Sequence, residues 1–176
     1  YGQSDGSWVD EASPTEPTFE GGQLTLETER LLGAICGDED SACRLTVLRL
    51  AGIYGPGRLI ARVDQLRAGL PVSGSADAWL NLIHVDDAAL VVSAVAAGSS
   101  TSPVLLVSDD RPVTRGEFYS AMAKEIGAPL PTFAPDSTQG RRTSGLNKRC
   151  RNARLHAELG IELRFPEAVA ALSRGI

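Results

Sequence analysis

Residues 44–58 read RLTVLRLAGIYGPGR and hold the strongest pattern in the chain. Apolar residues crowd the first half, over an interval too short for a helix of ordinary length: Leu45, Val47, Leu48 and Leu50. This pattern predicts a buried parallel strand that ends in a Gly-Ile-Tyr-Gly-Pro-Gly turn. In open α/β sheets, ligands bind beyond the carboxyl ends of the strands, where glycine lets the backbone approach a bound molecule. We therefore expect function at the end of this strand.

Composition narrows the class of protein. The 176 residues, 43% of them hydrophobic, suffice for one domain of ordinary size. A net charge of −5 argues against general nucleic-acid binding, and no apolar run is long enough to cross a bilayer. The sequence thus predicts a soluble, cytoplasmic protein with a small-molecule partner, no nucleic acid and no membrane. Because the first residue is Tyr1 and not Met, we expect the chain to begin inside a longer protein.

The rest of the chain alternates strand and helix and then becomes mostly helical. Periodicity and capping signals predict helices at 20–35, 59–68, 86–97, 115–126 and 152–159 and after Pro166, with the helix at 86–97 buried. Apolar runs at 80–85 and 104–107 indicate further strands, whereas 1–19 and 128–140 read as loop. The three cysteines (Cys36, Cys43 and Cys150) are odd in number and lack metal-like spacing, which favours buried or free thiols over disulfides or a zinc site.

Four motifs together carry a family resemblance. In order they are LRLAGIYGPGR, NLIHVDDAA, VLLVSDDRPVTRGEFY and NKRCRNARLHAELGI. They resemble the second half of an extended or atypical short-chain dehydrogenase/reductase, the family of NAD-dependent epimerases and dehydratases. The resemblance implies an α/β fold: a partial Rossmann-like, doubly wound parallel sheet with a small, mostly helical C-terminal substrate domain. Residues 1–110 would be the second half of the NAD(P)-binding domain, and 111–176 the substrate-binding part.

The resemblance also implies a cleft. Tyr1 and Gly2 resemble the Tyr-Gly that ends the family's fifth strand, and with Ala51, Gly52 and Ile53 they would contact NAD or NADP. Substrate would meet Tyr54, Gly55, Arg58 and His84. The residues themselves leave other roles open: Tyr54 as packing in a tight turn, Arg58 as a solvated surface residue, and His84 as a satisfied core histidine.

Two pieces of the family's machinery are missing. No glycine-rich phosphate loop follows a strand, so that loop would lie upstream of this chain, as would the catalytic Ser or Thr. The family's catalytic Tyr-x-x-x-Lys pair, in which Lys lowers the phenol pKa, is also absent: Gly21 and Thr25 occupy the two positions. Members that bind nucleotide sugars commonly carry Arg four residues before the His, where this chain has Leu80.

Three functions follow as hypotheses. The preferred one is a fragment of an NAD(P)-dependent oxidoreductase or epimerase/dehydratase-like protein that acts on a small hydroxyl or carbonyl substrate, inactive as this fragment alone. The second is a non-catalytic NAD(P)-binding scaffold or redox sensor of the same fold, and the third a free-standing helical interaction module. A homodimer through the helix at 20–35 is a further expectation from the family. We expect a solvated face for the basic residues of 141–154 rather than a phosphate clamp, and a turn role for Asp109 and Asp110 rather than a metal site.

Overall fold

The computed structural model describes residues 1–37, 43–135 and 146–174. The helices are α1 Glu20–Cys36, α2 Ile60–Arg67, α3 Val85–Ala96, α4 Arg115–Glu125, α5 Ala153–Leu159, α6 Ala168–Ala171 and the 3₁₀ turn η1 Leu172–Arg174. The strands are β1 Trp8–Val9, β2 Val47–Leu50, β3 Gly52–Tyr54, β4 Val72–Ser73, β5 Trp79–Leu80, β6 Leu82–His84, β7 Val104–Val107, β8 Val113–Thr114, β9 Phe133–Ala134 and β10 Arg149–Cys150. The predicted basic residues Arg141 and Arg142 lie outside the described residues, as does most of the predicted turn after the first helix.

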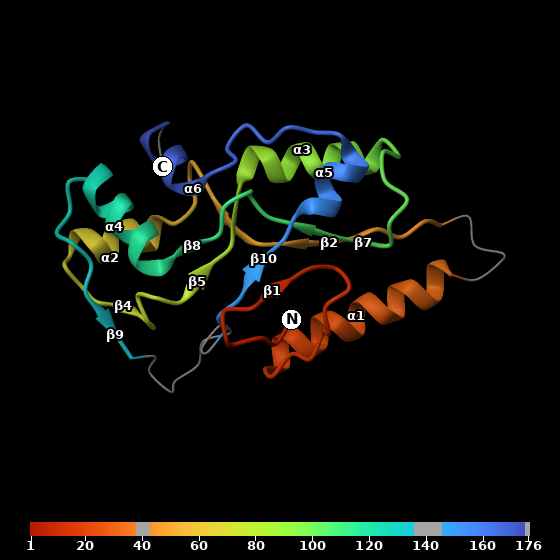
Figure 1. Ribbon diagram of the computed structural model, residues 1–176, viewed down its shortest axis with the longest axis horizontal. Coiled ribbons are helices and arrows are strands. Elements are labelled where there is room, and N and C mark those ends of the chain that lie inside the picture. Colours follow the sequence, from red (N-terminus) through yellow and green to blue (C-terminus); the bar gives the residue numbers. More distant parts are fainter. Residues whose placement is uncertain (38–42, 136–145, 175–176) are drawn as a thin grey trace.

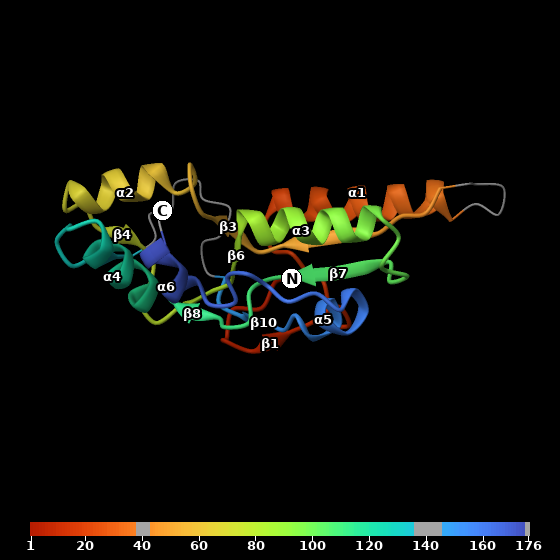
Figure 2. The same ribbon diagram turned by 90° about the horizontal axis from the view of Figure 1, so that it is seen from above.

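The chain has the predicted α/β fold with parallel strands. The pairs β2–β7, β3–β6, β1–β10 and β4–β9 are parallel, and β5–β8 is antiparallel. Figure 1 shows the pair β2–β7 between two helical layers, with α3 and α5 above it and α1 below. In the turned view of Figure 2, α2, α4 and α6 gather at one end of the molecule, away from β7 and α5.

The organising strand, β2, is parallel as predicted but not buried. Its first three residues are half-buried, and the side chain of Leu50 is 42% exposed. Pairing does not explain the difference, because within the described residues β7 pairs only with β2 and is nevertheless mostly buried. The prediction failed because one face of β2 is loosely covered. The helix on this face, α1, buries none of its own residues.

Local signals placed most helices correctly. Thr114 begins α4 by accepting a hydrogen bond from the amide of Glu117, and Gly160 ends α5 in the left-handed conformation with φ 60°. The N-cap of α3 is His84, two residues before the first of the two aspartates that indicated a helix start. This helix is only partly buried, since Val92 is 48% exposed on the side that faces away from the sheet strands.

Three segments depart from the loops and turns that we expected. The segment 1–19 contains β1, and 128–140 contains β9; both strands have two residues, too short to leave a periodic signal. Gly52 to Tyr54 forms β3 and not part of a turn, because its backbone pairs with β6. The turn itself begins one residue later, at Gly55.

Two larger hydrophobic clusters form most of the core. One joins β6, β7, α3 and α5 around Ile83, Val91 and Leu105. The other joins α2, β4, α4 and α6 around Leu66, Phe118 and Met122. The second cluster contains residues from both predicted parts of the chain, because α2 packs here with α4 and α6. The predicted division into 1–110 and 111–176 stays a prediction.

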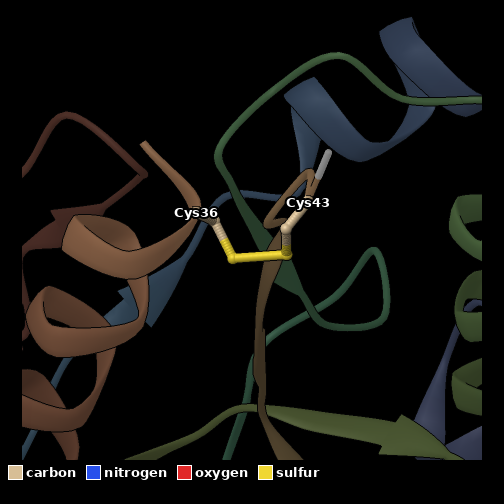
Figure 3. Close-up of a disulfide and its surroundings, with 2 residues drawn as sticks. All are labelled: Cys36 and Cys43. Atoms are coloured by element: carbon tan, nitrogen blue, oxygen red, sulfur yellow. A yellow bond between two sulfur atoms is a disulfide. The ribbon is translucent and has the colours of Figure 1, made fainter. Parts of the chain in front are cut away.

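The cysteine prediction was wrong for two of the three residues. Cys36 and Cys43 form a disulfide that links the end of α1 to the segment leading into β2 (Figure 3). Their Cα atoms lie 5.0 Å apart, a normal separation for a disulfide. The odd cysteine count hid this pair, whereas Cys150 is a buried free thiol as expected.

Candidate functional site

The candidate site lies where β3 and β6 end. In this parallel pair Tyr54 is the register partner of His84, so both side chains arrive at the same point of the sheet edge. Their rings meet edge to face, with centroids 5.2 Å apart, and Phe165 stacks on His84 at 3.7 Å. Both predicted substrate residues are almost fully buried, Tyr54 being 2% and His84 4% exposed.

Asp87 holds the backbone of Phe165, the residue that stacks on His84. Its buried carboxylate accepts hydrogen bonds from the backbone amides of Arg164 and Phe165, each at 2.9 Å. The Nδ1 atom of His84 accepts from the amide of Asp86 at 3.2 Å, which places the proton of the neutral imidazole on Nε2. The His-Val-Asp-Asp motif therefore holds the C-terminal segment against the sheet edge.

The loop after β3 requires glycine and presents arginine. Gly55 has φ 125°, and a Cβ atom there would lie 2.8 Å from Nε2 of His84. No larger residue fits without moving the histidine ring. Beyond it, Arg58 closes the turn by donating its amide to the carbonyl of Gly55, and its side chain is exposed to solvent.

A buried carboxyl that we had assigned to a turn belongs to the same cluster. Asp109 follows β7 and is 2% exposed, and neither of its carboxyl oxygens has a hydrogen-bond partner among the described residues. Burial raises the pKa of Asp109 to about 8, although the nearby amides of Ala168 and Arg111 favour the charged form. The group is therefore mostly protonated at neutral pH. Its position directly after a buried parallel strand was the signal in the sequence that could have identified it.

Tyr54 is equally unpartnered. Its hydroxyl makes no hydrogen bond to a described residue. Burial, and after it the carboxyls of Asp109 and Asp87, raises the pKa of the phenol. Tyr54 thus stays neutral at physiological pH, so the centre of the cluster offers hydrogen-bonding groups and not a phenolate.

Four of the five residues predicted to contact a cofactor are held by the surrounding protein. Ala51 and Gly52 donate their amides to the carbonyls of Val107 and Asn81, so these N–H groups are committed to the sheet. Gly2 is packed so tightly that a Cβ atom would lie only 2.0 Å from the carbonyl oxygen of Glu16. Ile53 packs against the first core cluster.

Tyr1, the fifth predicted cofactor residue, packs against an ion pair between β2 and α1. The guanidinium of Arg49 sits 4.9 Å from the ring centroid of Tyr1 and makes two hydrogen bonds, of 2.6 and 3.1 Å, to the carboxylate of Glu29. The side chains of Arg49 and Glu29 are 18% and 17% exposed. This pair links β2 to the middle of α1.

Between these two elements runs a cavity of about 950 Å³, which we call the α1–β2 groove. It is lined mostly by apolar atoms, and both positions of the missing catalytic pair, Gly21 and Thr25, lie on it. The hydroxyl of Thr25 donates to the carbonyl of Gly21 within the helix, at 2.8 Å. Neither position supplies a phenol or an amine. Among residues 1–37, 43–135 and 146–174, no cluster of side chains could hold a metal ion, and no helix could cross a membrane.

Comparison with known proteins defines the class of fold first. No protein-family model matches the chain. A protein from Methylobacillus flagellatus classed with the NAD-dependent epimerases/dehydratases matches 99% of the chain with a TM-score of 0.74 and 30% identity. A human epimerase family protein with NADPH matches 96% with a TM-score of 0.76 and 22% identity. The chain therefore has the Rossmann-like α/β fold of these proteins.

Two relatives add to this comparison. A conserved protein of unknown function from Silicibacter pomeroyi is 33% identical, with a TM-score of 0.82 over 99% of this chain and 61% of its own. Protein YeeZ of Escherichia coli is 27% identical over 169 residues, which are 95% of this chain and 56% of YeeZ. The chain thus spans little more than half the length of the proteins it matches.

Proposed function

We propose that the chain is the C-terminal part of an NAD(P)-dependent oxidoreductase or epimerase/dehydratase-like protein that acts on a small hydroxyl or carbonyl substrate. The observation that carries the proposal is the fold match over 99% of the chain to a longer protein classed with the NAD-dependent epimerases/dehydratases. The cluster of Tyr54, His84 and Asp109 at the carboxyl edge of the sheet supports it, because this edge is where such folds bind ligands.

The cofactor would be NAD or NADP, and this chain would hold only its nicotinamide side. The residues proposed for this contact are Tyr1 and Gly2 together with the segment that leads from β2 into β3: Ala51, Gly52 and Ile53. The amides of Ala51 and Gly52 are bonded within the sheet, so they cannot form a pyrophosphate cradle, and no glycine-rich loop in the sequence replaces them. The bound cofactor would supply hydride exchange, and its phosphates would be held outside this chain.

The substrate side is proposed to be the loop after β3. Arg58 is the exposed cation of this loop and would meet an anionic group, whereas the buried Tyr54 and His84 hold the loop in place around Gly55. Tyr54 is neutral and Asp109 is mostly protonated at pH 7, so each offers a hydrogen-bonding group without a charge. A substrate carbonyl or hydroxyl would suit these groups better than a cation.

A homodimer through α1 is part of the proposal. Two of its large apolar side chains, Leu31 and Ile35, are 57% and 67% exposed and do not line the α1–β2 groove. Replacing both by Glu should turn a dimer of the longer protein into a monomer without loss of folding, as measured by light scattering. A mass unchanged by the double substitution would place the dimer interface elsewhere or exclude it.

Binding of NADH and NADPH to the longer protein tests the main proposal. For at least one of the two, calorimetry should give a dissociation constant in the micromolar range, which corresponds to a binding free energy on the order of −8 kcal/mol. No binding of either, by a protein that is folded and contains its upstream half, would contradict the proposal.

The second candidate is a non-catalytic NAD(P)-binding scaffold or redox sensor. Gly21 and Thr25 at the positions of the catalytic pair favour it. The double variant Gly21→Tyr with Thr25→Lys separates the two candidates, because it restores the acid and its cation on one helix face. A scaffold would remain inactive with a panel of hydroxyl and carbonyl substrates, whereas an enzyme that has lost only this pair would gain turnover.

A further inference from the structure

Two tryptophans and two arginines alternate on the surface formed by β1, β5 and β10. The guanidinium carbon of Arg149 lies 5.0 Å from the ring centroid of Trp79 and 4.9 Å from that of Trp8, and Arg151 lies 5.6 Å from Trp8. All three separations are within the range of a cation–π contact. We call this set of four residues, Trp79, Arg149, Trp8 and Arg151, the Trp–Arg ladder.

The backbone explains why these side chains line up. Trp8 is the register partner of Arg149 in the parallel pair β1–β10, and Arg151 lies two residues further along, on the same face as Arg149. The side-chain oxygen of Asn147 accepts from the amide of Trp79, which brings β5 beside β10. The ladder is therefore built by three strands that are distant in sequence.

The two guanidinium groups of the ladder lack acidic partners. Neither forms an ion pair with a described residue, and Arg149 uses only Nε, which donates to the carbonyl of Gly6. No terminal nitrogen of Arg149 or Arg151 donates to a described residue. The side chain of Arg151 is exposed, and Trp8 is 46% exposed.

The two carboxylates that follow β1 in the chain, Asp10 and Glu11, form their hydrogen bonds and ion pairs with other residues. Glu11 accepts from the amide of Leu106 and pairs with Arg154 at 3.7 Å. Asp10 is held by Ser13, whose hydrogen bond is the main cause of the lowered pKa of Asp10, while the charge of Arg151 contributes least. The ladder thus keeps two positive charges that the protein itself does not neutralise.

The ladder also lies at the ligand-binding edge of the sheet. Val9 and Cys150, from β1 and β10, pack on Leu106 of β7 in a small buried cluster. Asn81, directly before β6, bonds the amide of Cys150 and the carbonyl of Lys148. Because the amide of Asp109 bonds the next residue, Leu82, this tie lies close to the carboxyl end of β7. Figures 1 and 2 both show β1 and β10 side by side and close to β7.

We infer that the Trp–Arg ladder is an oxyanion-binding site, in which the free terminal N–H groups of Arg149 and Arg151 bind a phosphate or carboxylate group of a ligand beside the half-exposed Trp8. Guanidinium forks match the geometry of such oxyanions, and stacking on indole rings holds the forks in place before the anion arrives. If the proposed function is correct, this group belongs to the substrate. The binding itself does not depend on that function.

The chain reports on this site directly, because its two tryptophans are both members of the ladder. The experiment uses the longer protein, with any tryptophan outside this chain replaced by Phe. Indole emission is followed during titration with sodium phosphate, with sodium acetate and with sodium chloride at matched ionic strength. We expect a saturable change with phosphate, with acetate, or with both, and none with chloride. The two oxyanion arms show whether the site takes phosphate, carboxylate or either.

Two variants assign the response to the ladder. Arg151→Gln removes one guanidinium that makes no hydrogen bond to a described residue, so the variant should fold, and it should weaken anion binding about tenfold or more. Arg111→Gln removes an equal charge from an arginine bonded to Glu117 and Glu167, and should leave the dissociation constant unchanged. Absence of a saturable response to either oxyanion, an equal response to chloride, or wild-type affinity in Arg151→Gln would overturn the inference. Oxyanion binding without NAD(P)H binding would refute the proposed function and leave this site standing.

Discussion

Replacing Asp109 by Asn should make the protein more stable at pH 8 and should remove part of its pH dependence. The pKa of this buried carboxyl is raised from an ordinary value of about 3.9 to about 8, a shift of about four units. In this interval the folded state holds a proton that the unfolded state releases. The free energy of unfolding therefore falls as the pH rises from about 4 to about 8, and the loss is complete above pH 8.

The size of the effect follows from the shift. Four units at about 1.4 kcal/mol each set an upper limit of about 5–6 kcal/mol for the cost of the ionised carboxyl at pH 8 and above. An asparagine amide buried without partners would cost about 1–3 kcal/mol. We therefore expect Asp109→Asn to lower the free energy of unfolding by about 1–3 kcal/mol near pH 4 and to raise it by about 2–5 kcal/mol at pH 8.

Urea unfolding at unit intervals from pH 5 to pH 9, followed by tryptophan emission, measures this difference. The gap between variant and wild type should move in favour of the variant as the pH rises and then level off above pH 8. Asp77→Asn, which removes an exposed carboxylate, is the matched control and should show no such change. A gap for Asp109→Asn that stays constant from pH 5 to pH 9 would refute the assignment of a buried, protonated carboxyl.

Three further outcomes are expected. Gly55→Ala should destabilise the protein by about 1–3 kcal/mol, because the alanine would have φ 125° and its Cβ atom would lie 2.8 Å from His84. Gly57→Ala is the control: with φ 73° and open space around it, it should cost about 1 kcal/mol, and equal losses in thermal unfolding would contradict the steric argument. Reduction of the disulfide, which closes a loop of sequence separation 7, should lower the free energy of unfolding by about 2–3 kcal/mol, and an unchanged urea midpoint with dithiothreitol would argue against it. Burial lowers the pKa of His156, but hydrogen bonds to Asp110 and to a backbone carbonyl raise it on balance. The His156–Asp110 pair should therefore stabilise the fold by less than about 1 kcal/mol below about pH 6.5, and this contribution should be lost as the pH rises through the raised pKa. His156→Gln should accordingly lower the free energy of unfolding at about pH 5.5 and leave it unchanged at about pH 9.

The elements that the sequence predicted best are those fixed by local chemistry. Thr114 at the start of α4 and Gly160 at the end of α5 satisfy helix ends within a few residues of themselves, so their effect can be seen without the fold. The strand at 104–107 is apolar throughout because both of its faces are covered: Leu105 and Val107 pack with residues of α3 and α5, and Leu106 packs with Val9 and Cys150. This also leaves a local signal.

The predictions that failed depend on distant segments. The half-exposed state of β2 reflects how loosely α1 covers it, which no residue of β2 encodes. The disulfide depends on the path of the chain between Cys36 and Cys43, and β1 forms only because β10 lies beside it. Two-residue strands of this kind are set by their partners and not by their own sequence.

The candidate site divides in the same way. Tyr54 and His84 could be found because each follows an apolar run with a recognisable motif, and the parallel register then brings them together. The position of Asp109 after an apolar run was a usable signal, whereas the alignment of Trp8 with Arg149 could not be foreseen, because it arises from two strands more than one hundred residues apart in the sequence.

Amide hydrogen exchange in the longer protein, with and without NADPH or NADH, tests most directly whether this chain lines a cofactor cleft. We predict slower exchange on cofactor binding in peptides that cover the carboxyl end of β2 and the loop after β3, residues 50–58, together with residues 1–3. Peptides from the exposed outer end of α1 should exchange at the same rate in both states. Cofactor binding without any added protection at residues 50–58 would contradict the account, since the ligand would then lie away from the edge that this chain provides.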